Sequence, residues 1–231
     1  MSRQTSTTAQ SHLITLNKKL IAFDMDGTLI NGRLVFVLGD RFGVSDAVKT
    51  IMSKRTAGYK KSEEIAKLWN GLKPDDIVEA IASVPLMKGA ADVIRELKRR
   101  GHKVGIISDS YTLATGYIAR KLDMDFHLAN ILMEKDGLVT GELRMLLGWD
   151  KIGCTCKISV CKRFHLEKVA KLLNVALNKT IAIGDTASDL CMINAAAVGI
   201  AFNPKDKVLA NNADRIINNL DLSEMLQYVD K

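Results

Sequence analysis

The stretch KLIAFDMDGT, residues 19–28, places a short apolar run directly before a pair of aspartates. Two later stretches repeat this arrangement: VGII at 104–107 precedes Ser108, and TIAI at 180–183 precedes Gly184-Asp185. Continuous rather than alternating apolarity is typical of parallel strands that are buried on both faces. Because helical patterns separate the three runs, the sequence predicts an α/β fold with a doubly wound parallel sheet.

The segments between the runs carry their own signals. The clearest helix is expected at 90–100, where Gly101 supplies the stop and four apolar residues share one stripe: Ala90, Val93, Ile94 and Leu97. The pair Asp136-Gly137 between strand-like flanks predicts a β-hairpin. From 33 to 84 the strand signal fades and helical patterning dominates, with Pro74 near a helix start. We therefore expect a flexible tail at 1–17, an α/β core at 18–30 and 86–231, and an inserted helical cap at 31–85.

Composition and charge narrow the classes of function. Hydrophobic residues make up 47% of the 231 positions and charged residues 26%, as in ordinary globular proteins. No apolar stretch approaches the ~20 residues needed to cross a bilayer, so no membrane association is expected. The net charge of +7 is scattered, and we interpret the basic spot Lys54-Arg55 with Lys60-Lys61 as a solvated helix face. The sequence predicts no nucleic-acid partner.

Polar residues that follow the apolar runs should meet at one edge of the sheet, where open α/β sheets bind their ligands. They are Asp24, Asp26, Ser108, Asp109, Asp185 and Asp189. Crowded carboxylates repel one another unless a cation lies among them, and hard oxygen ligands suit Mg²⁺. The Ser108 hydroxyl and the Gly27-Thr28 turn supply the donors and close backbone approach that a phosphate needs. Metal plus phosphate is the simplest joint interpretation.

The segment Asp24-Met25-Asp26-Gly27-Thr28 resembles the signature of the haloacid dehalogenase (HAD) superfamily of phosphatases, and the superfamily's other motifs follow in order. The stretch from Lys162 through Asp189 to Tyr228 is most similar to the phosphoserine phosphatase branch. The resemblance covers 19–231. It implies a Rossmann-like HAD core with an inserted cap, and Mg²⁺-dependent hydrolysis of a small phosphorylated metabolite through an aspartyl-phosphate.

The resemblance also implies roles for particular residues. Asp24 would be the nucleophile, and Asp26 would protonate the leaving alkoxide and then deprotonate the hydrolytic water. Ser108 and Lys162 would hold the phosphoryl oxygens, with Thr28 beside them. Three nearby lysines stay open as alternatives to Lys162: Lys157, Lys168 and Lys171.

The same resemblance implies a ligand set for Mg²⁺. Asp185 would bind the ion together with Asp24 and the backbone carbonyl of Asp26. Asp189 would bind through water or orient a ligand. From its position alone, Asp189 could also simply cap the helix that follows it.

Three positions depart from the phosphoserine phosphatase pattern. Arg33 stands where that branch has a glutamate that reads the substrate amine, Trp69 aligns with an arginine that binds the substrate carboxylate, and Asp109-Ser110 replaces two glycines. We therefore expect phosphoserine not to be the preferred substrate, and Arg33 to favour a leaving group bearing a carboxylate, a second phosphate or hydroxyls. Asp109 could pair with Arg33 or bind substrate hydroxyls. Trp69 could instead be a core residue.

The cysteines form a second group. Cys154, Cys156, Cys161 and His165 could hold zinc, but their spacing is not that of familiar zinc modules, so we expect no stoichiometric zinc. Cys191 is interpreted as core packing. No apolar signal segment precedes the cysteines, which favours a reducing cytoplasm over a disulfide framework.

Two other functions stay open at this point. A phosphotransferase would discharge the same aspartyl-phosphate to an alcohol rather than to water. A non-catalytic phosphometabolite-binding protein would keep the fold without turnover, although it would need no pair such as Asp24 and Asp26. The sequence leaves the oligomeric state open, a homodimer included.

Overall fold

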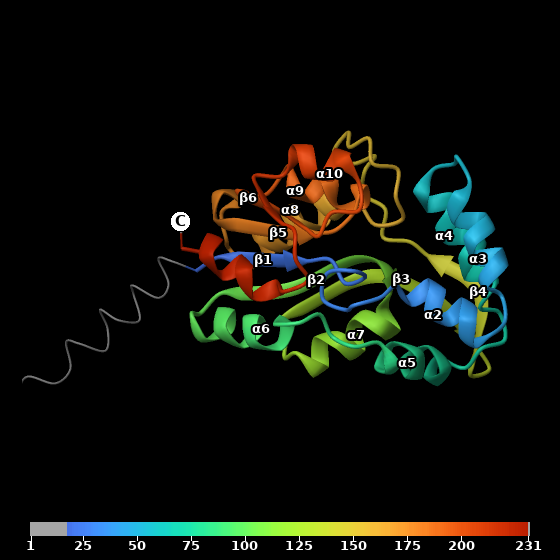
Figure 1. Ribbon diagram of the computed structural model, residues 1–231. Helices are drawn as coiled ribbons and strands as arrows, with labels where there is room; N and C mark the ends of the chain where they lie inside the picture. Colours follow the sequence, from blue (N-terminus) through green and yellow to red (C-terminus); the bar gives the residue numbers. More distant parts are fainter. Residues whose placement is uncertain (1–17, 231) are drawn as a thin grey trace, which may run out of the picture.

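The computed structural model describes residues 18–230 and contains one seven-stranded sheet (Figure 1). Its strands are β1 (Leu20–Phe23), β2 (Lys103–Tyr111), β3 (Phe126–Lys135), β4 (Leu138–Arg144), β5 (Thr180–Gly184), β6 (Val198–Phe202) and β7 (Arg215–Ile217). The spatial order is β4-β3-β2-β1-β5-β6-β7, and only the β3–β4 pair is antiparallel. This arrangement confirms the predicted α/β class. The predicted tail at 1–17 lies outside the described residues.

Helices cover both faces of the sheet. In chain order they are α2 (Leu34–Arg41), α3 (Ser45–Ser53), α4 (Gly58–Lys67), α5 (Pro74–Ser83), α6 (Ala90–Arg99), α7 (Thr112–Lys121), α8 (Lys162–Leu172), α9 (Leu190–Ile193) and α10 (Lys207–Asn212), with 3-10 turns η1 (Leu177–Lys179), η2 (Ala187–Asp189) and η3 (Leu222–Tyr228). Helices α6 and α7 lie on one side of the strands and α8, α9 and α10 on the other (Figure 1). Within residues 18–230 no helix is long and apolar enough to cross a membrane.

Burial on both faces explains why the residues of the central strand β1 are apolar throughout. Ile21 and Phe23 pack into the core on the side of α6 and α7, whereas Leu20 and Ala22 pack into the core beneath α8 and α9. All four side chains are fully buried. Successive residues of a strand point to opposite faces, so a strand with helices on both sides needs the continuous apolarity on which the prediction rested.

Strand register brings the predicted site residues to one edge of the sheet. Phe23, the last residue of β1, pairs with Ile106 in β2 and with Ile183 in β5. The residues that follow these three positions therefore meet at the carboxyl edge of the sheet. Strand β2 does not end with its apolar run at Ile107, because it continues past Ser108 to Tyr111 with an irregular register beyond Ile107.

The helical segment α2–α5 leaves and rejoins the sheet-bearing part of the chain at adjacent points. Ile30 and Leu86 form an antiparallel bridge, and the backbone N–H of Asn31 donates to the carbonyl of Pro85 over 2.9 Å. Figure 1 shows these helices at one end of the molecule, next to β4. The β3–β4 hairpin turns at the predicted Asp136-Gly137 pair. It contacts the helical segment where the backbone N–H of Gly71 donates to the carbonyl of Val139.

Candidate active site

A buried ion-pair cluster lies where β1, α8 and η2 meet. The Lys162 ammonium, at the first residue of α8, donates hydrogen bonds to Asp24 Oδ1 over 2.6 Å and to Asp189 Oδ1 over 2.5 Å. Lys162 and Asp189 are completely buried, and Asp24 nearly so. The three alternative lysines, Lys157, Lys168 and Lys171, are exposed. The structure therefore brings Lys162, and none of these three, to Asp24.

The buried cluster contains more acidic than basic groups. Burial raises the pKa of Asp24 well above its ordinary value; Lys162 opposes that rise, while Asp189 and Asp185 add to it. Burial alone would lower the pKa of Lys162, but Asp189 and Asp24 outweigh it and hold that pKa well above its ordinary value. One fully buried ammonium thus lies among three buried carboxylates, and the excess negative charge favours binding of a further cation.

Asp185 supplies the oxygen on which such a cation can bind. Its Oδ2 accepts a hydrogen bond from the Arg33 guanidinium over 3.2 Å, whereas its buried Oδ1 has no hydrogen-bond partner. Carboxylate oxygens of Asp24, Asp185 and Asp189 lie within 4.8 Å of one another. An unpaired buried carboxylate oxygen is costly unless it binds a cation, and an all-oxygen set is what Mg²⁺ prefers. These residues fit the metal that the sequence predicts.

Two glycines allow the loops of this site to approach closely. Gly27 has a φ of +81°, and a Cβ there would lie 2.2 Å from Asp185 Oδ2. A Cβ on Gly184 would lie 2.2 Å from Asp189 Cγ. Asp189 Oδ2 accepts the backbone N–H groups of Asp185 (3.0 Å) and Thr186 (3.1 Å). Both oxygens of Asp189 are thus engaged by the protein, which favours an orienting role for it.

Asp26 is held next to the entrance of helix α2. Its Oδ1 accepts the backbone N–H of Leu34, the first residue of α2, over 2.6 Å. Burial raises the pKa of Asp26 to about 6, although the hydrogen bond from Leu34 opposes the rise. A carboxyl group with a pKa near the working pH can both give and take a proton, which is what a general acid and base requires.

Hydroxyl groups near the sheet edge are buried and in part unpaired. Ser108 is fully buried, and its Oγ accepts the backbone N–H of Ser110 over 3.2 Å. Thr28 Oγ1 and Ser110 Oγ are buried without a hydrogen-bond partner. Buried hydroxyls normally find partners, so these groups are available to a bound anion.

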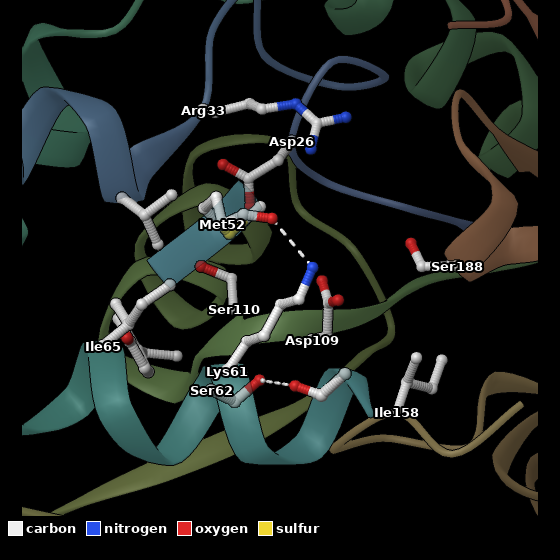
Figure 2. A pocket seen from close by; sticks show the side chains of 13 residues that line it. Asp26, Arg33, Met52, Lys61, Ser62, Ile65, Asp109, Ser110, Ile158 and Ser188 are labelled. Atoms are coloured by element: carbon white, nitrogen blue, oxygen red, sulfur yellow. Dashed lines mark hydrogen bonds between the residues drawn. The ribbon is translucent and has the colours of Figure 1, made fainter. Parts of the chain in front are cut away.

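A cavity of about 190 Å³ opens beside Asp26, and Figure 2 shows the side chains that line it. Arg33 and Asp109, which we expected to contact substrate, both line it. Arg33, which could have paired with Asp109, forms its salt bridge with Asp185. Substrate hydroxyls remain as the other partner considered for Asp109. Because ligand pockets commonly span ~300–1,000 Å³, this cavity has room only for a small molecule.

Sequence reasoning missed Lys61. Its half-buried side chain extends from α4 into the cavity, where its ammonium donates to the backbone carbonyl of Met52 over 2.8 Å (Figure 2). The interpretation of the basic spot as a solvated face is therefore wrong for Lys61, whereas Lys60 is exposed. The signal was present in the helical spacing, because Lys61 and the buried Ile65 are four residues apart and share one face of α4.

The positions of Trp69 and of the cysteines decide two questions that the sequence left open. Trp69 is fully buried, and its indole N–H donates to the Tyr111 hydroxyl over 2.8 Å, so it is a core residue and does not line the cavity. The fourth residue grouped with Cys154, Cys156 and Cys161 is Cys191 and not His165, which corrects the expectation for both. The His165 ring lies 3.3 Å from the carbonyl of Leu146.

A buried aspartate directly follows the central strand of the sheet, a second aspartate lies two residues further along the chain, and a buried lysine pairs with the first. This combination defines a class of phosphoryl-transferring hydrolases. The chain belongs to the haloacid dehalogenase-like hydrolase family, whose model matches residues 21–194.

Named relatives narrow the class further. The chain is 34% identical over 216 residues to the phosphoserine phosphatase of Methanocaldococcus jannaschii, covering 92% of this chain and 98% of the relative. It is 31% identical to that of Lactococcus lactis subsp. lactis, covering 93% and 96%. Two solved structures, of substrate-bound phosphoserine phosphatase and of its phospho-aspartyl intermediate analogue, each match with a TM-score of 0.80 and 32% identity over 92% of this chain and at least 98% of theirs. The chain is a HAD-type phosphatase that hydrolyses phosphomonoesters.

The titration of Asp185 gives a test of the site in the metal-free protein. Burial raises the pKa of this carboxyl from 3.8 to about 6, against the opposing charge of Arg33. The folded protein therefore binds more protons than the unfolded chain between these values, so the free energy of unfolding should fall as pH rises from about 4 to about 6, and then level off. At ~1.36 kcal/mol per pKa unit, the contribution is up to about 3 kcal/mol.

The measurement is urea unfolding of metal-free protein at pH 4.5 and 6.5, in wild type and in Asp185→Asn. The variant lacks the titrating group, so its stability relative to wild type should increase between the two values. A difference that does not change with pH would contradict the assignment.

Proposed function

We propose that this phosphatase is Mg²⁺-dependent and acts through an aspartyl-phosphate formed on Asp24. The observation that carries the proposal is the buried cluster in which Lys162 pairs with both Asp24 and Asp189 while Asp185 presents an unpaired oxygen. In this proposal Asp24, Asp185 and the backbone carbonyl of Asp26 hold Mg²⁺. When bound, the ion neutralises the carboxylates and the phosphoryl oxygens, so that an anionic ester can approach.

The residues of the chain then have distinct tasks. Asp24 attacks the phosphorus in line with the leaving oxygen, and Lys162 and Ser108 hold the phosphoryl oxygens as charge develops on them. Asp26 gives its proton to the leaving alkoxide. It then takes a proton from the water that hydrolyses the aspartyl-phosphate, which returns both carboxyls to their starting states. A pKa of about 6 for Asp26 suits both steps.

We propose residues 31–85 as a cap that closes over the ester. The adjacent ends of the segment, bridged at Ile30 and Leu86, support this assignment because they leave only two chain crossings between cap and core. Arg33 and Lys61 belong to the segment and line the cavity together with Asp109 from the core. Closure would exclude water until the ester is bound and would let cap residues select the leaving group.

Two cations of the cap in one small cavity support a substrate other than phosphoserine. The ammonium of phosphoserine would share this cavity with Arg33 and Lys61, and like charges repel one another. A small leaving group with a carboxylate, a second phosphate or several hydroxyls would instead accept their hydrogen bonds. We propose such a phosphorylated metabolite as the substrate.

The free thiols of the chain support a reducing, cytoplasmic location.

Substrate preference is tested by comparing kcat/KM for phosphoserine with the values for phosphoglycolate, sugar phosphates and nucleoside monophosphates. An ester with an anionic or polyhydroxylated leaving group should exceed phosphoserine at least tenfold. Hydrogen bonds to charged groups are worth about 1.5–3 kcal/mol, so Lys61→Met should lower kcat/KM for that ester by roughly 10- to 100-fold. The matched control Lys60→Met alters the exposed neighbour and should have no effect. A tenfold lead of phosphoserine would contradict the proposal.

The reaction itself is tested with a generic aryl phosphate, with and without Mg²⁺. Release of inorganic phosphate that requires Mg²⁺ is expected. Addition of an alcohol such as glycerol distinguishes the alternatives, since a phosphotransferase would form the alcohol phosphate in place of inorganic phosphate. A protein that only binds phosphorylated metabolites would release neither product.

A further inference from the structure

We propose that Cys154, Cys156, Cys161 and Cys191 form a structural zinc site, which reverses the expectation of no zinc that rested on the spacing of the first three with His165. These are all the cysteines of the chain. Their sulfur atoms lie within 4.8 Å of one another, although Cys191 is thirty positions beyond Cys161 in the sequence. All four are free thiols.

The arrangement matches what zinc requires. A structural zinc ion binds four ligands at the corners of a tetrahedron, with Zn–S distances of about 2.3 Å, which places the sulfur atoms roughly 3.8 Å apart. Sulfurs that lie within 4.8 Å of one another need to approach by at most about 1 Å to reach that separation. Four thiolates complete the coordination shell, so the site is of the closed, structural kind.

A backbone donor contacts the sulfur group. The backbone N–H of Arg163 is directed at Cys191 Sγ over 3.4 Å. Such N–H groups commonly support metal-bound sulfur and spread its charge. A second cavity, separate from the substrate cavity, is lined by Cys154, Cys156, Cys191 and Arg163, whose guanidinium pairs with Glu167 over 2.7 Å.

The segment that carries the first three ligands is a long loop that zinc would stabilise. Residues 145–161 connect β4 to α8 without a helix or strand of their own. Loops longer than ~12–15 residues without secondary structure are uncommon in compact domains. The two ends of this loop pair with each other at the bridge between Leu147 and Val160, whereas the part that carries Cys154 and Cys156 is held by isolated turns, such as the hydrogen bond from the Cys154 N–H to the Trp149 carbonyl. A zinc ion would join the segment to α9 and stabilise both.

The site would also act on the phosphatase centre through the backbone. Cys161 directly precedes Lys162, and Cys191 lies two positions after Asp189. Zinc would therefore hold together the two chain segments whose side chains form the Lys162–Asp189 ion pair. Its role is to position these residues, since no sulfur of the group takes part in the proposed reaction.

Zinc content of the full-length protein tests the proposal. Protein purified under reducing conditions without chelator, and then given excess Zn²⁺ and dialysed, should retain one zinc per chain by elemental analysis. Cys191→Ser should lose this zinc, whereas the matched control His165→Gln should keep it, because His165 lies outside the sulfur group. Removal of the metal by a chelator should lower the Tm of wild type but not that of Cys191→Ser.

A second measurement needs no variant. Co²⁺ added to reduced, metal-free wild type should produce the visible absorption of tetrahedral cobalt–thiolate coordination, and one equivalent of Zn²⁺ should abolish it. Less than 0.2 zinc per chain after reconstitution, or cobalt that gives no thiolate absorption, would overturn the proposal. So would retention of zinc by Cys191→Ser with its loss from His165→Gln. None of these readouts depends on phosphatase activity.

Discussion

Replacement of Asp24 by asparagine should abolish nearly all phosphate release. An amide oxygen is a poor nucleophile and cannot form the acyl-phosphate on which the proposed reaction depends. The amide is close in shape to the carboxyl and can still accept the hydrogen bond from Lys162, so the fold and part of the Mg²⁺-dependent phosphate binding should survive. Steady-state assays of phosphate release, together with phosphate binding by calorimetry, measure the two effects separately.

Asp26→Asn is the matched comparison. It alters a carboxyl two residues away and should slow turnover by ~10²- to 10⁴-fold, the usual contribution of a positioned acid and base. Trapping by rapid acid quench should detect phosphate bound to protein in wild type and in Asp26→Asn, but not in Asp24→Asn. Turnover by Asp24→Asn at the wild-type rate would refute the mechanism.

Replacement of Lys162 by methionine should cost both turnover and stability. The substitution keeps an unbranched apolar side chain that is shorter by one atom, and it removes the only ammonium that contacts Asp24 and Asp189 within residues 18–230. Removing one partner of a buried ion pair typically costs about 3 to 5 kcal/mol, which corresponds to a fall in Tm of roughly 6 to 20 °C for a chain of this size. Turnover should fall because the phosphoryl oxygens lose their cation.

The pH dependence of that loss separates an electrostatic cause from a packing defect. Without Lys162, the buried carboxylates are uncompensated only while they are ionised, and burial already raises the pKa of Asp24 and Asp185. The deficit in stability should therefore be smaller at pH 5 than at pH 8. Lys168→Met changes an exposed lysine of the same helix and should be neutral. A deficit that is equal at both pH values would indicate lost packing alone.

The sheet and the edge that carries the candidate site were predictable because strand patterns and motif positions are local in sequence. Continuous apolar runs identified β1, β2 and β5, and each is followed by the polar residues that the parallel register brings together. Lys162 could be selected among four lysines only through its resemblance to a family position, since burial of a lysine leaves no trace in its own neighbourhood of sequence.

Contacts between distant segments were not predictable in the same way. Nothing near Cys191 indicates that α9 places it beside Cys161, because that proximity depends on how α8 and α9 pack together. Lys61 was misread for a related reason. An amphipathic helix defines its buried face from spacing, but whether a basic residue at the border of that face meets solvent or a cavity depends on the element opposite.

The bridge between Ile30 and Leu86 has a consequence for how such a phosphatase can diversify. Because the α2–α5 segment departs and returns through neighbouring hydrogen-bonded positions, a replacement of quite different length could close across the same short span at little entropic cost. The pairing of Phe23 with Ile183, which brings Asp24 and Asp185 to the same edge, involves only β1 and β5 and would be undisturbed by the exchange. On the proposed cap assignment, ligand selectivity and bond-breaking chemistry would be inherited as separable parts, and grafting the segment of one relative onto the sheet of another would be a direct route to new specificities.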